Sequence, residues 1–239
     1  MQVTTKAIVF SSLKFGDTSL IVKAFTASDG LKSYLLKGIL ASKKGKLKVA
    51  YFQPLTQLEL VALHRNKGTL ETIKEAKIQY AYVSIHCNLA KNALVLFLAE
   101  LLGNAIQEEE RNPELFQFME SAFQWLDLNT EVANFHLVFL LRLTQFLGFY
   151  PETSEIAGAY FDLEEGRFTD SPTLYTQIKG DNLTHFKLFL GTDFDTMNTI
   201  GMSKYSRQEL LKSIMLYYEL HIHGFRNPKS LAILNEVFS

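Results

Sequence analysis

The alternation of apolar and polar positions along the first 80 residues is typical of short β-strands. The five alternating segments are residues 3–10, 18–26, 31–37, 53–64 and 69–79, and turn-forming residues separate several of them. Five short strands in a segment of this length predict a small closed barrel. A five-stranded OB-fold is our leading interpretation, and an SH3-like barrel is the alternative.

From residue 81 onward the apolar positions recur with the period of an α-helix. Residues 81–106 predict one long and very apolar helix. Asn112, Pro113 and Glu114 form a typical helix start, with an N-cap, a proline in the first turn and a carboxylate near the positive end of the helix dipole. This second helix is expected to run to about residue 128.

Two further helices are predicted in the second half of the chain. Thr130 starts one of them, and Gly148 ends it. Ser206 and Glu209 have the spacing of a capping box and predict the start of the other, which Gly224 ends. The chain therefore combines a β-barrel with an all-α part, which is an α+β multidomain organisation.

The segment 150–180 interrupts the helical pattern and is rich in glycine, threonine, aspartate and proline. Its middle, from Tyr160 to Phe168, predicts a small hairpin. We therefore expect a barrel domain at 1–79, a helical domain at 80–149 and 181–239, and an insert at 150–180.

Cysteine usage and hydropathy limit the class of protein. Cys87 is the single cysteine among 239 residues, which excludes an intrachain disulfide and a multi-cysteine zinc site within one chain. The first ten residues lack the apolar stretch of a secretory signal. Lys91 and Glu100 interrupt the most apolar window, which favours a buried helix over a membrane span. We expect a cytoplasmic protein with no membrane contact.

Charge is divided unevenly along the chain. Residues 1–80 hold 13 lysines and arginines against five acidic residues, whereas the rest of the chain holds 11 basic and 20 acidic residues. This split predicts a polyanion-binding barrel on a protein-binding helical body. Six lysines lie between residues 30 and 58 without an acidic residue among them, and they suit a phosphate backbone. A solvated turn beside inward-packed aromatics explains the same pattern equally well.

Catalytic and metal motifs are not evident in the sequence. Gly38 and Gly45 have the wrong spacing for a nucleotide-binding phosphate loop, and Leu47 stands where a magnesium-binding hydroxyl is needed. His221 and His223 lie two apart on a helix and point in different directions. We expect no enzymatic activity, no metal and no cofactor, and we expect His86 and Cys87 to be core residues.

Three stretches of the chain carry a resemblance to a known family. The first runs from Lys6 to Phe10 and from Phe15 to Val22; the second is Gly30 to Gly38 with Phe52-Gln53-Pro54-Leu55; the third is Arg207 to His221 with Pro228 to Leu231. Their order and spacing extend over the full length of the chain. Together they resemble the RecO family of bacterial DNA repair and recombination mediators.

The resemblance implies an N-terminal OB-fold, a helical domain and a small insert that often binds zinc. It also implies a non-enzymatic protein that binds single- and double-stranded DNA, anneals complementary strands and works with RecR. Such proteins help RecA displace single-strand-binding protein, whose acidic C-terminal tail they contact. This chain departs from the family because its insert has no cysteines. We therefore predict a degenerate, zinc-free ribbon held by packing alone.

The resemblance favours DNA as the ligand of the basic barrel. The expected DNA-binding residues are Lys6, Lys14, Lys23, Lys32, Tyr34, Lys37, Lys43, Lys44, Lys46 and Lys48. An acidic peptide is expected to dock on the helical body near Arg142, Arg207, Arg226 and Lys229. For Arg142 itself, the sequence favours an ion pair with an internal carboxylate over a contact with the peptide. The alternative function is a protein-only adaptor whose basic barrel binds an acidic partner.

Overall fold

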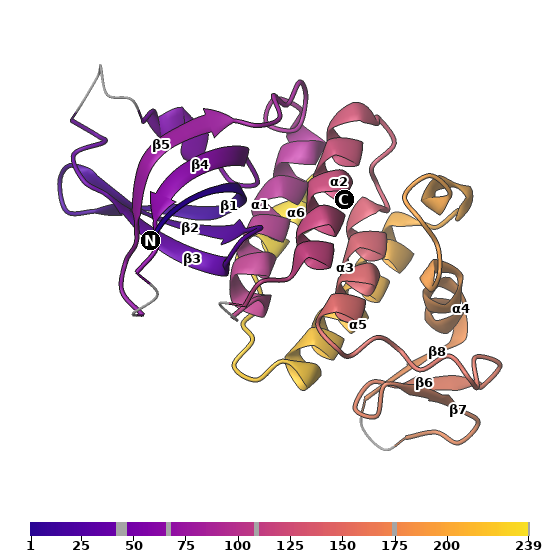
Figure 1. Cartoon of the computed structure of the whole chain (residues 1–239). Helices are drawn as coiled ribbons and strands as arrows, with labels where there is room; N and C mark the ends of the chain where they lie inside the picture. Colours follow the sequence, from indigo (N-terminus) through magenta and orange to yellow (C-terminus); the bar gives the residue numbers. More distant parts are fainter. Residues whose placement is uncertain (42–46, 66–67, 108–109, 174–175, 239) are drawn as a thin grey trace. The chain divides into compact units, whose positions relative to one another are not determined.

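The computed structural model describes residues 1–41, 47–65, 68–107, 110–173 and 176–238 (Figure 1). Residue contacts divide the chain into two compact units, Met1–Asp127 and Leu128–Ser239. The barrel and the first two helices form the first unit, so that unit extends well past residue 79. The second unit contains the remaining helices and the insert.

Five strands form the antiparallel sheet of the first unit, in the order β3-β2-β1-β4-β5. They are β1 (Gln2–Phe15), β2 (Ser19–Thr26), β3 (Gly30–Leu36), β4 (Gln57–Leu63) and β5 (Thr72–Ile78), and the 3₁₀ turn η1 (Val49–Phe52) precedes β4. A short parallel bridge between Tyr34 and Glu71 brings the two edge strands together. This strand order with β3 parallel to β5 is the OB-fold, as predicted.

Every second side chain along a strand points into the barrel and fills its core. In β2, Leu20, Val22 and Ala24 are buried in the barrel core, as the pattern predicts. Phe25 points to the other face of the strand and is also buried, with its ring stacked between those of Phe10 and Phe116. The outer face of β2 is therefore covered at this point and not solvated.

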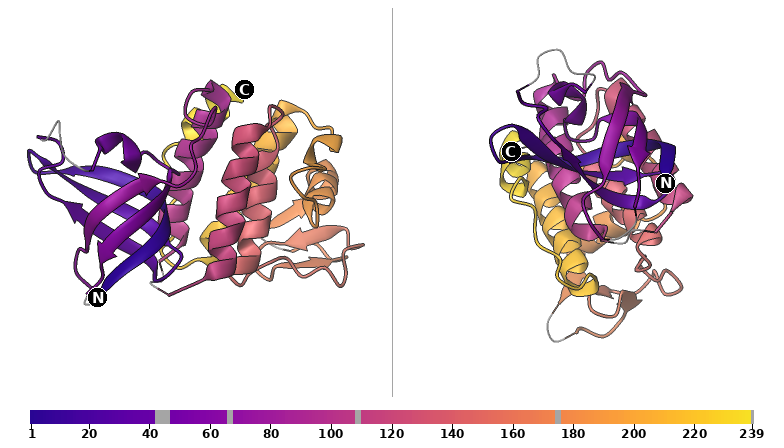
Figure 2. Two further views of the ribbon diagram at one scale, coloured as in Figure 1. Left: turned by 45° about the horizontal axis from the view of Figure 1, so that its top comes forward. Right: turned by 60° about the vertical axis from the view of Figure 1, so that its left-hand side comes forward.

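Two helices complete the first unit, α1 (Leu89–Ala105) and α2 (Pro113–Leu128). The α1 helix lies against the barrel (Figures 1 and 2). The prediction for α2 is confirmed, because Asn112 Oδ1 accepts the Leu115 N–H at 2.9 Å. The prediction that α1 begins at residue 81 is wrong, because Asn88 caps the helix and the preceding residues are not helical.

The Asp127 carboxylate explains why the chain before α1 is not helical. This buried group accepts hydrogen bonds from three consecutive backbone N–H groups, those of Val83, Ser84 and Ile85, at 2.8–3.2 Å. Lys91 Nζ donates to the backbone carbonyl of Asp127 at 2.7 Å. The end of α2 thus fixes both the connection from the barrel and the start of α1.

Cys87 and His86 lie in this connection and not on a buried helix. Cys87 is exposed, so its expected place in the core is wrong. His86 is partly buried and its Nε2 bonds the Pro54 carbonyl at 3.0 Å. Next to Pro54, Leu55 has φ of 60° and is fully buried. Tyr82 Oη donates to the Leu55 carbonyl at 3.0 Å, so the connection holds this strained turn in place.

The second unit is built from α3 (Phe135–Phe146), α4 (Gly180–Phe189), α5 (Lys204–His221) and α6 (Leu231–Val237), with the 3₁₀ turn η2 (Met197–Thr199) between α4 and α5. The expected helix start at Thr130 is wrong by five residues. The expected capping box is also wrong, because Ser203 is the N-cap of α5 and accepts the N–H of Ser206 at 3.0 Å. The pattern missed α4 and α6, which are short.

Packing holds the cysteine-free insert together, as predicted. Its strands β6 (Tyr160–Asp162), β7 (Arg167–Thr169) and β8 (Gln177–Lys179) form a sheet in the order β7-β6-β8, which adds a third strand to the expected hairpin. The Phe161 ring lies 4.9 Å from Phe168, 4.6 Å from Phe186 and 5.7 Å from Tyr217 between centroids. Phe161 and Phe168 are almost fully buried, so aromatic contacts anchor the sheet to α4 and α5.

The described ranges contain no group of three His, Cys, Asp or Glu side chains arranged to hold a metal ion. His221, which the sequence brought into question as a ligand, bonds the Leu163 carbonyl through Nε2 at 2.9 Å and stacks on Phe149. No helix within the same ranges is long and apolar enough to cross a membrane.

We expect Asp127→Asn to lower the free energy of unfolding by about 1–3 kcal/mol, because a neutral amide replaces the charged acceptor of three N–H groups. Burial acts to raise the pKa of the Asp127 carboxyl, but its hydrogen bonds from Val83, Ser84 and Ile85 outweigh burial and hold the pKa below its ordinary value. Such a group stabilises the fold above its unfolded-state pKa and loses that effect as the pH falls through the folded-state pKa.

The difference between wild type and Asp127→Asn should therefore be full at pH 7 and shrink below about pH 4. Denaturant unfolding at both pH values measures it. Asp17→Asn is the matched control, since Asp17 is exposed. A difference that stays constant between the two pH values would contradict the assignment.

We expect Phe161→Ala to lower the free energy of unfolding of its unit by about 3–5 kcal/mol, because the ring is fully buried among three other rings. A metal chelator should leave the melting temperature of the wild type unchanged. Thermal unfolding measures both effects, and Ile233→Ala on an exposed position of α6 is the control. A large fall in melting temperature on chelation would overturn the packing explanation.

Candidate nucleic-acid interface

The structure divides the expected DNA-binding residues by environment. Lys14, Lys37 and Lys48 are exposed, Lys6 and Lys23 reach the helices of the first unit, and Lys32 and Tyr34 are buried; Lys43, Lys44 and Lys46 lie outside the described residues. The expected DNA-binding residues that the structure describes thus fall into an exposed group, a group that contacts helices and a buried group. Lys14, Lys37 and Lys48, in the exposed group, offer a charge to a ligand.

Lys6 and Lys23 connect the barrel to its own helices. Lys6 Nζ lies 2.9 Å from Glu120 Oε1 on α2, with the lysine side chain half exposed. Lys23 Nζ donates to the Gly103 carbonyl on α1 at 2.6 Å, and partial burial lowers the pKa of its amine. Both lysines satisfy partners within the unit, so neither is a free phosphate ligand in this structure.

Lys32 and Tyr34 belong to the barrel interior. Tyr34 is fully buried, burial raises the pKa of its phenol, and its Oη lies 2.8 Å from His64 Nε2. His64 Nδ1 in turn lies 2.9 Å from Asp29 Oδ2. Burial acts to raise the pKa of the Asp29 carboxyl, but hydrogen bonds from Ser28 and His64 and the charge of Lys32 hold it below its ordinary value.

The expectation that Tyr34 stacks on a base is therefore corrected. The Tyr34 ring has no exposed surface on which a base could stack, and its hydroxyl is hydrogen-bonded to His64. Lys32 is only 6% exposed, so it too is withdrawn from the interface. Alternation along β3 places residues 32, 34 and 36 toward the interior, which the charge of Lys32 obscured in the sequence.

Strand pairing brings Lys14 and Lys37 to the same end of the barrel. Lys14 pairs with Leu20 across β1 and β2, and Leu20 pairs with Leu36, which precedes Lys37. The backbone N–H of Leu40 donates to the Thr18 carbonyl at 2.9 Å, which ties the chain after β3 to the β1–β2 turn.

The tip of the β1–β2 hairpin carries exposed apolar side chains beside Lys14. Leu13 is 66% exposed and Phe15 is 53% exposed, and both lie on one face because they are two residues apart in a strand. Lys48 lies at the start of η1, with Nζ 5.8 Å from the centroid of the Tyr51 ring. An exposed aromatic ring suits an unpaired base, and exposed lysines suit its phosphates.

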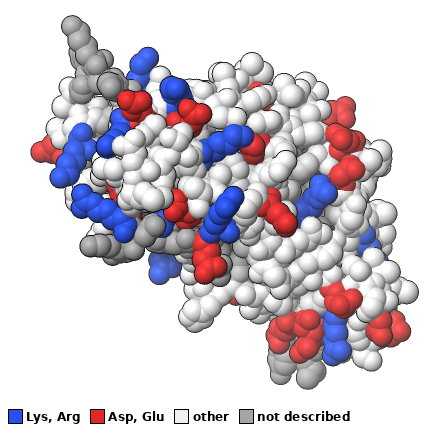
Figure 3. All heavy atoms as spheres, viewed as in Figure 1, with Lys and Arg blue, Asp and Glu red and all other residues white. Residues whose placement is uncertain are grey.

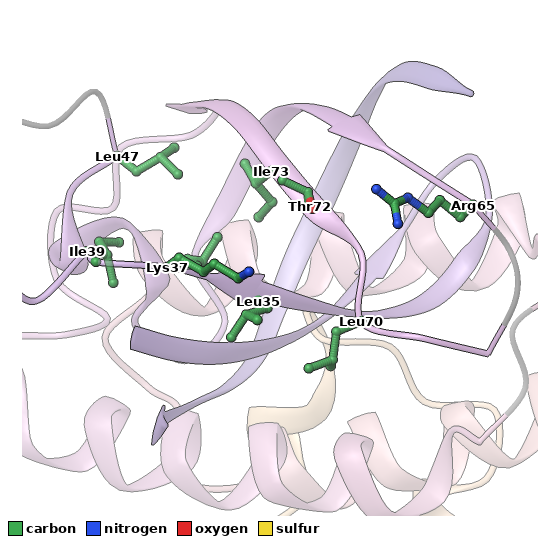
Figure 4. Close-up of a pocket in the computed structure, with 10 residues that line it drawn as sticks. Leu35, Lys37, Ile39, Leu47, Arg65, Leu70, Thr72 and Ile73 are labelled. Atoms are coloured by element: carbon green, nitrogen blue, oxygen red, sulfur yellow. The ribbon is translucent and has the colours of Figure 1, made fainter. Parts of the chain in front are cut away.

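Arg65 is a further exposed cation that the sequence reasoning missed. It follows β4 directly, and its backbone N–H donates to both carboxylate oxygens of Glu71 at 2.9 Å. Its guanidinium and the amine of Lys37 line a cavity between β3 and β5 (Figure 4). The sequence did contain a signal for its exposure, because Arg65 lies between the end of an alternating segment and a turn.

The remaining exposed lysines of the barrel have local partners. Lys74 Nζ donates to Gln2 Oε1 at 2.8 Å, and Lys77 Nζ lies 3.7 Å from Glu59 Oε1. Figure 3 shows basic side chains spread over the barrel with acidic side chains among them, and acidic side chains gathered over the β6–β8 sheet. On this face the excess of basic residues in the barrel does not form one continuous positive patch.

The expected partner-binding residues lie in different environments. Arg142 is partly buried, with its guanidinium carbon 5.8 Å from the centroid of the Phe194 ring. Arg207 Nε donates to Asn134 Oδ1 at 2.9 Å, and burial lowers the pKa of its guanidinium. Arg226 and Lys229 are exposed on the chain between α5 and α6.

A groove of about 470 Å³ lies between α5 and α6, and none of those four residues lines it. Glu209 and Glu219 do line it, together with Lys212. The two carboxylates would oppose an acidic peptide at this place. Docking of an acidic tail near the four basic residues therefore stays a prediction.

We expect Tyr34→Phe to lower the free energy of unfolding by about 1–3 kcal/mol, because it leaves buried His64 Nε2 without its partner. The affinity for single-stranded DNA should not change, since the hydroxyl is inside the barrel. Denaturant unfolding and fluorescence anisotropy measure the two quantities on the same protein. A loss of DNA affinity with unchanged stability would restore Tyr34 to the interface.

Comparison with known proteins assigns a family to both parts of the chain. The family model described as "Recombination protein O N terminal" matches residues 1–82, and the model described as "Recombination protein O C terminal" matches residues 86–232. The two boundaries fall on either side of the connection that Asp127 holds.

Curated relatives match over the whole chain. The DNA repair protein RecO of Christiangramia forsetii is 52% identical over 238 residues, covering 100% of both chains. The proteins of the same name from Flavobacterium psychrophilum and Bacteroides fragilis are 46% and 40% identical and cover 100% and 98% of both chains. On these matches and the observed fold, the chain belongs to the RecO family of DNA repair proteins.

Proposed function

We propose that this protein is a non-catalytic recombination mediator that binds single- and double-stranded DNA through its OB-fold barrel. The observation that carries the proposal is the end of the barrel where strand pairing brings together Lys14 and Lys37, both exposed, with the exposed ring of Phe15 next to Lys14 in the chain. Lys48, which precedes η1, is exposed as well. Membership of the RecO family supports it.

DNA binding at this end of the barrel would be mainly electrostatic and would not depend on the DNA sequence. Lysines neutralise phosphates and release counterions, and an exposed aromatic ring stacks on any base. Contacts of this kind position a strand without reading its bases. Annealing follows from the same property: the protein lowers the repulsion between two strands, and base pairing supplies the specificity. No residue has to act as an acid, a base or a nucleophile.

The protein partners follow from the family and not from a contact in this structure. We propose that the protein works with RecR and helps RecA replace single-strand-binding protein on DNA, contacting the acidic C-terminal tail of that protein through its helical body. The RecA filament would be engaged indirectly. Lys43, Lys44 and Lys46, which lie outside the described residues, stay predicted phosphate ligands in the same basic stretch.

We expect replacement of Lys14, Lys37 and Lys48 by alanine to weaken binding of a labelled single-stranded oligonucleotide similarly for all sequences. The slope of log affinity against log salt should fall by roughly 2, at about 0.7 per lost phosphate contact. Fluorescence anisotropy across a salt series measures both.

The matched control is the Lys74→Ala and Lys77→Ala double variant, which removes exposed lysines that already have partners on β1 and β4. It should change affinity and slope far less. Unchanged binding by the triple variant would move the DNA site away from this end of the barrel. Absence of wild-type binding at low salt would instead favour the protein-only adaptor.

A further inference from the structure

The barrel has an open seam between its two edge strands. β3 and β5 meet at the Tyr34–Glu71 bridge, where the Leu35 N–H donates to the Glu71 carbonyl at 2.9 Å and the Glu71 N–H donates to the Ser33 carbonyl at 2.8 Å. Among the described residues, the sheet does not pair the two strands beyond this point. A cavity of about 650 Å³ lies where they diverge.

The cavity, which we call the seam groove, is lined mainly by aliphatic side chains and contains two cations. Its lining side chains are Leu35, Leu36, Lys37, Ile39, Leu47, Arg65, Leu70, Thr72 and Ile73, together with Gly38. Lys37 and Arg65 extend into the space from opposite sides (Figure 4). No carboxylate and no aromatic ring is among these lining residues. Leu70 is 40% exposed, so the apolar surface is open to solvent at the rim.

These features fit a peptide better than a nucleic acid. Bases are held by aromatic rings, and no aromatic side chain is among the lining residues of the seam groove. Extended peptides add to unpaired strand edges, with alternate side chains in apolar pockets. Lys37 and Arg65 each form charge-assisted hydrogen bonds with carboxylates. The occupant that satisfies all three features is an extended segment with aliphatic residues between acidic ones.

We propose that the seam groove is a docking site for an extended acidic and aliphatic peptide segment of a partner protein. The segment lies between β3 and β5, buries aliphatic side chains against Leu35, Leu70 and Ile73, and places carboxylates on Lys37 and Arg65. The proposal goes beyond DNA binding, because Arg65 and Leu70 are not part of the DNA-binding end of the barrel.

Lys37 is common to both sites, and this has a consequence for how they work together. A peptide carboxylate on Lys37 removes one phosphate ligand from the neighbouring DNA-binding end. Peptide and DNA therefore compete partially, and a partner that docks in the seam groove lowers the affinity of the barrel for DNA.

The test uses a fluorescent peptide in which a run of leucine and isoleucine residues is flanked on both sides by aspartates, titrated with the full chain. We expect it to bind, and we expect the same peptide with asparagine for aspartate to bind roughly tenfold more weakly, since the neutral amides lose the charge-assisted hydrogen bonds with Lys37 and Arg65. Arg65→Ala and Leu70→Ser should each weaken binding of the aspartate peptide by a similar factor. Lys48→Ala, an exposed lysine outside the groove, is the matched control and should change it less than twofold.

Folding and binding are both measured on each variant to decide whether the proposal holds. Circular dichroism melting shows whether each variant is folded, and Leu70→Ser changes a half-exposed position that leaves the barrel core intact. Equal binding of the two peptides, or wild-type affinity in both Arg65→Ala and Leu70→Ser, overturns the proposal. So does a single-stranded oligonucleotide that loses affinity in Leu70→Ser as strongly as the peptide does, because the seam groove would then be a DNA site.

Discussion

The bridge between Tyr34 and Glu71 is the constraint on which the rest of the barrel depends. Without it, β3 and β5 would be the two free edges of an open sheet, and the interior would be exposed along both. The buried chain of hydrogen bonds from Tyr34 through His64 to Asp29 lies beside it and joins β3, the end of β4 and the β2–β3 turn. Closure at one point makes the sheet a barrel and leaves the seam groove open next to it.

Closure also decides which lysines are available to a ligand. The α1 and α2 helices cover the outer face of the sheet and engage Lys6 and Lys23, while the interior takes Lys32. Lys14 and Lys37 stay exposed because they lie at the ends of their strands, past the positions that contact α1 and α2. The barrel therefore leaves Lys14 and Lys37 exposed at one end and Arg65 exposed after β4, while Lys6 and Lys23 contact neighbouring elements.

Aromatic packing holds the small cysteine-free insert in place. Its three short strands would be marginal alone, since a sheet this small buries little apolar surface. Phe161 and Phe168 add apolar contacts by packing against Phe186 on α4, and Phe161 also packs against Tyr217 on α5. The insert is therefore part of the core of the second unit.

The sequence by itself determined the strands of the barrel, the main helices and the cysteine-free insert, because alternation and helical period are local patterns. The family followed from the resemblance of three stretches of the chain to known proteins. The sequence pattern misplaced the start of α1, since only the Asp127 carboxylate at the far end of α2 keeps Val83, Ser84 and Ile85 out of the helix. It took Tyr34 and Lys32 for surface residues and passed over Arg65, because the face a strand residue occupies depends on which strands and helices pack against it. Free charge and open cavities are properties of contacts between distant segments, and only the tertiary structure decided them.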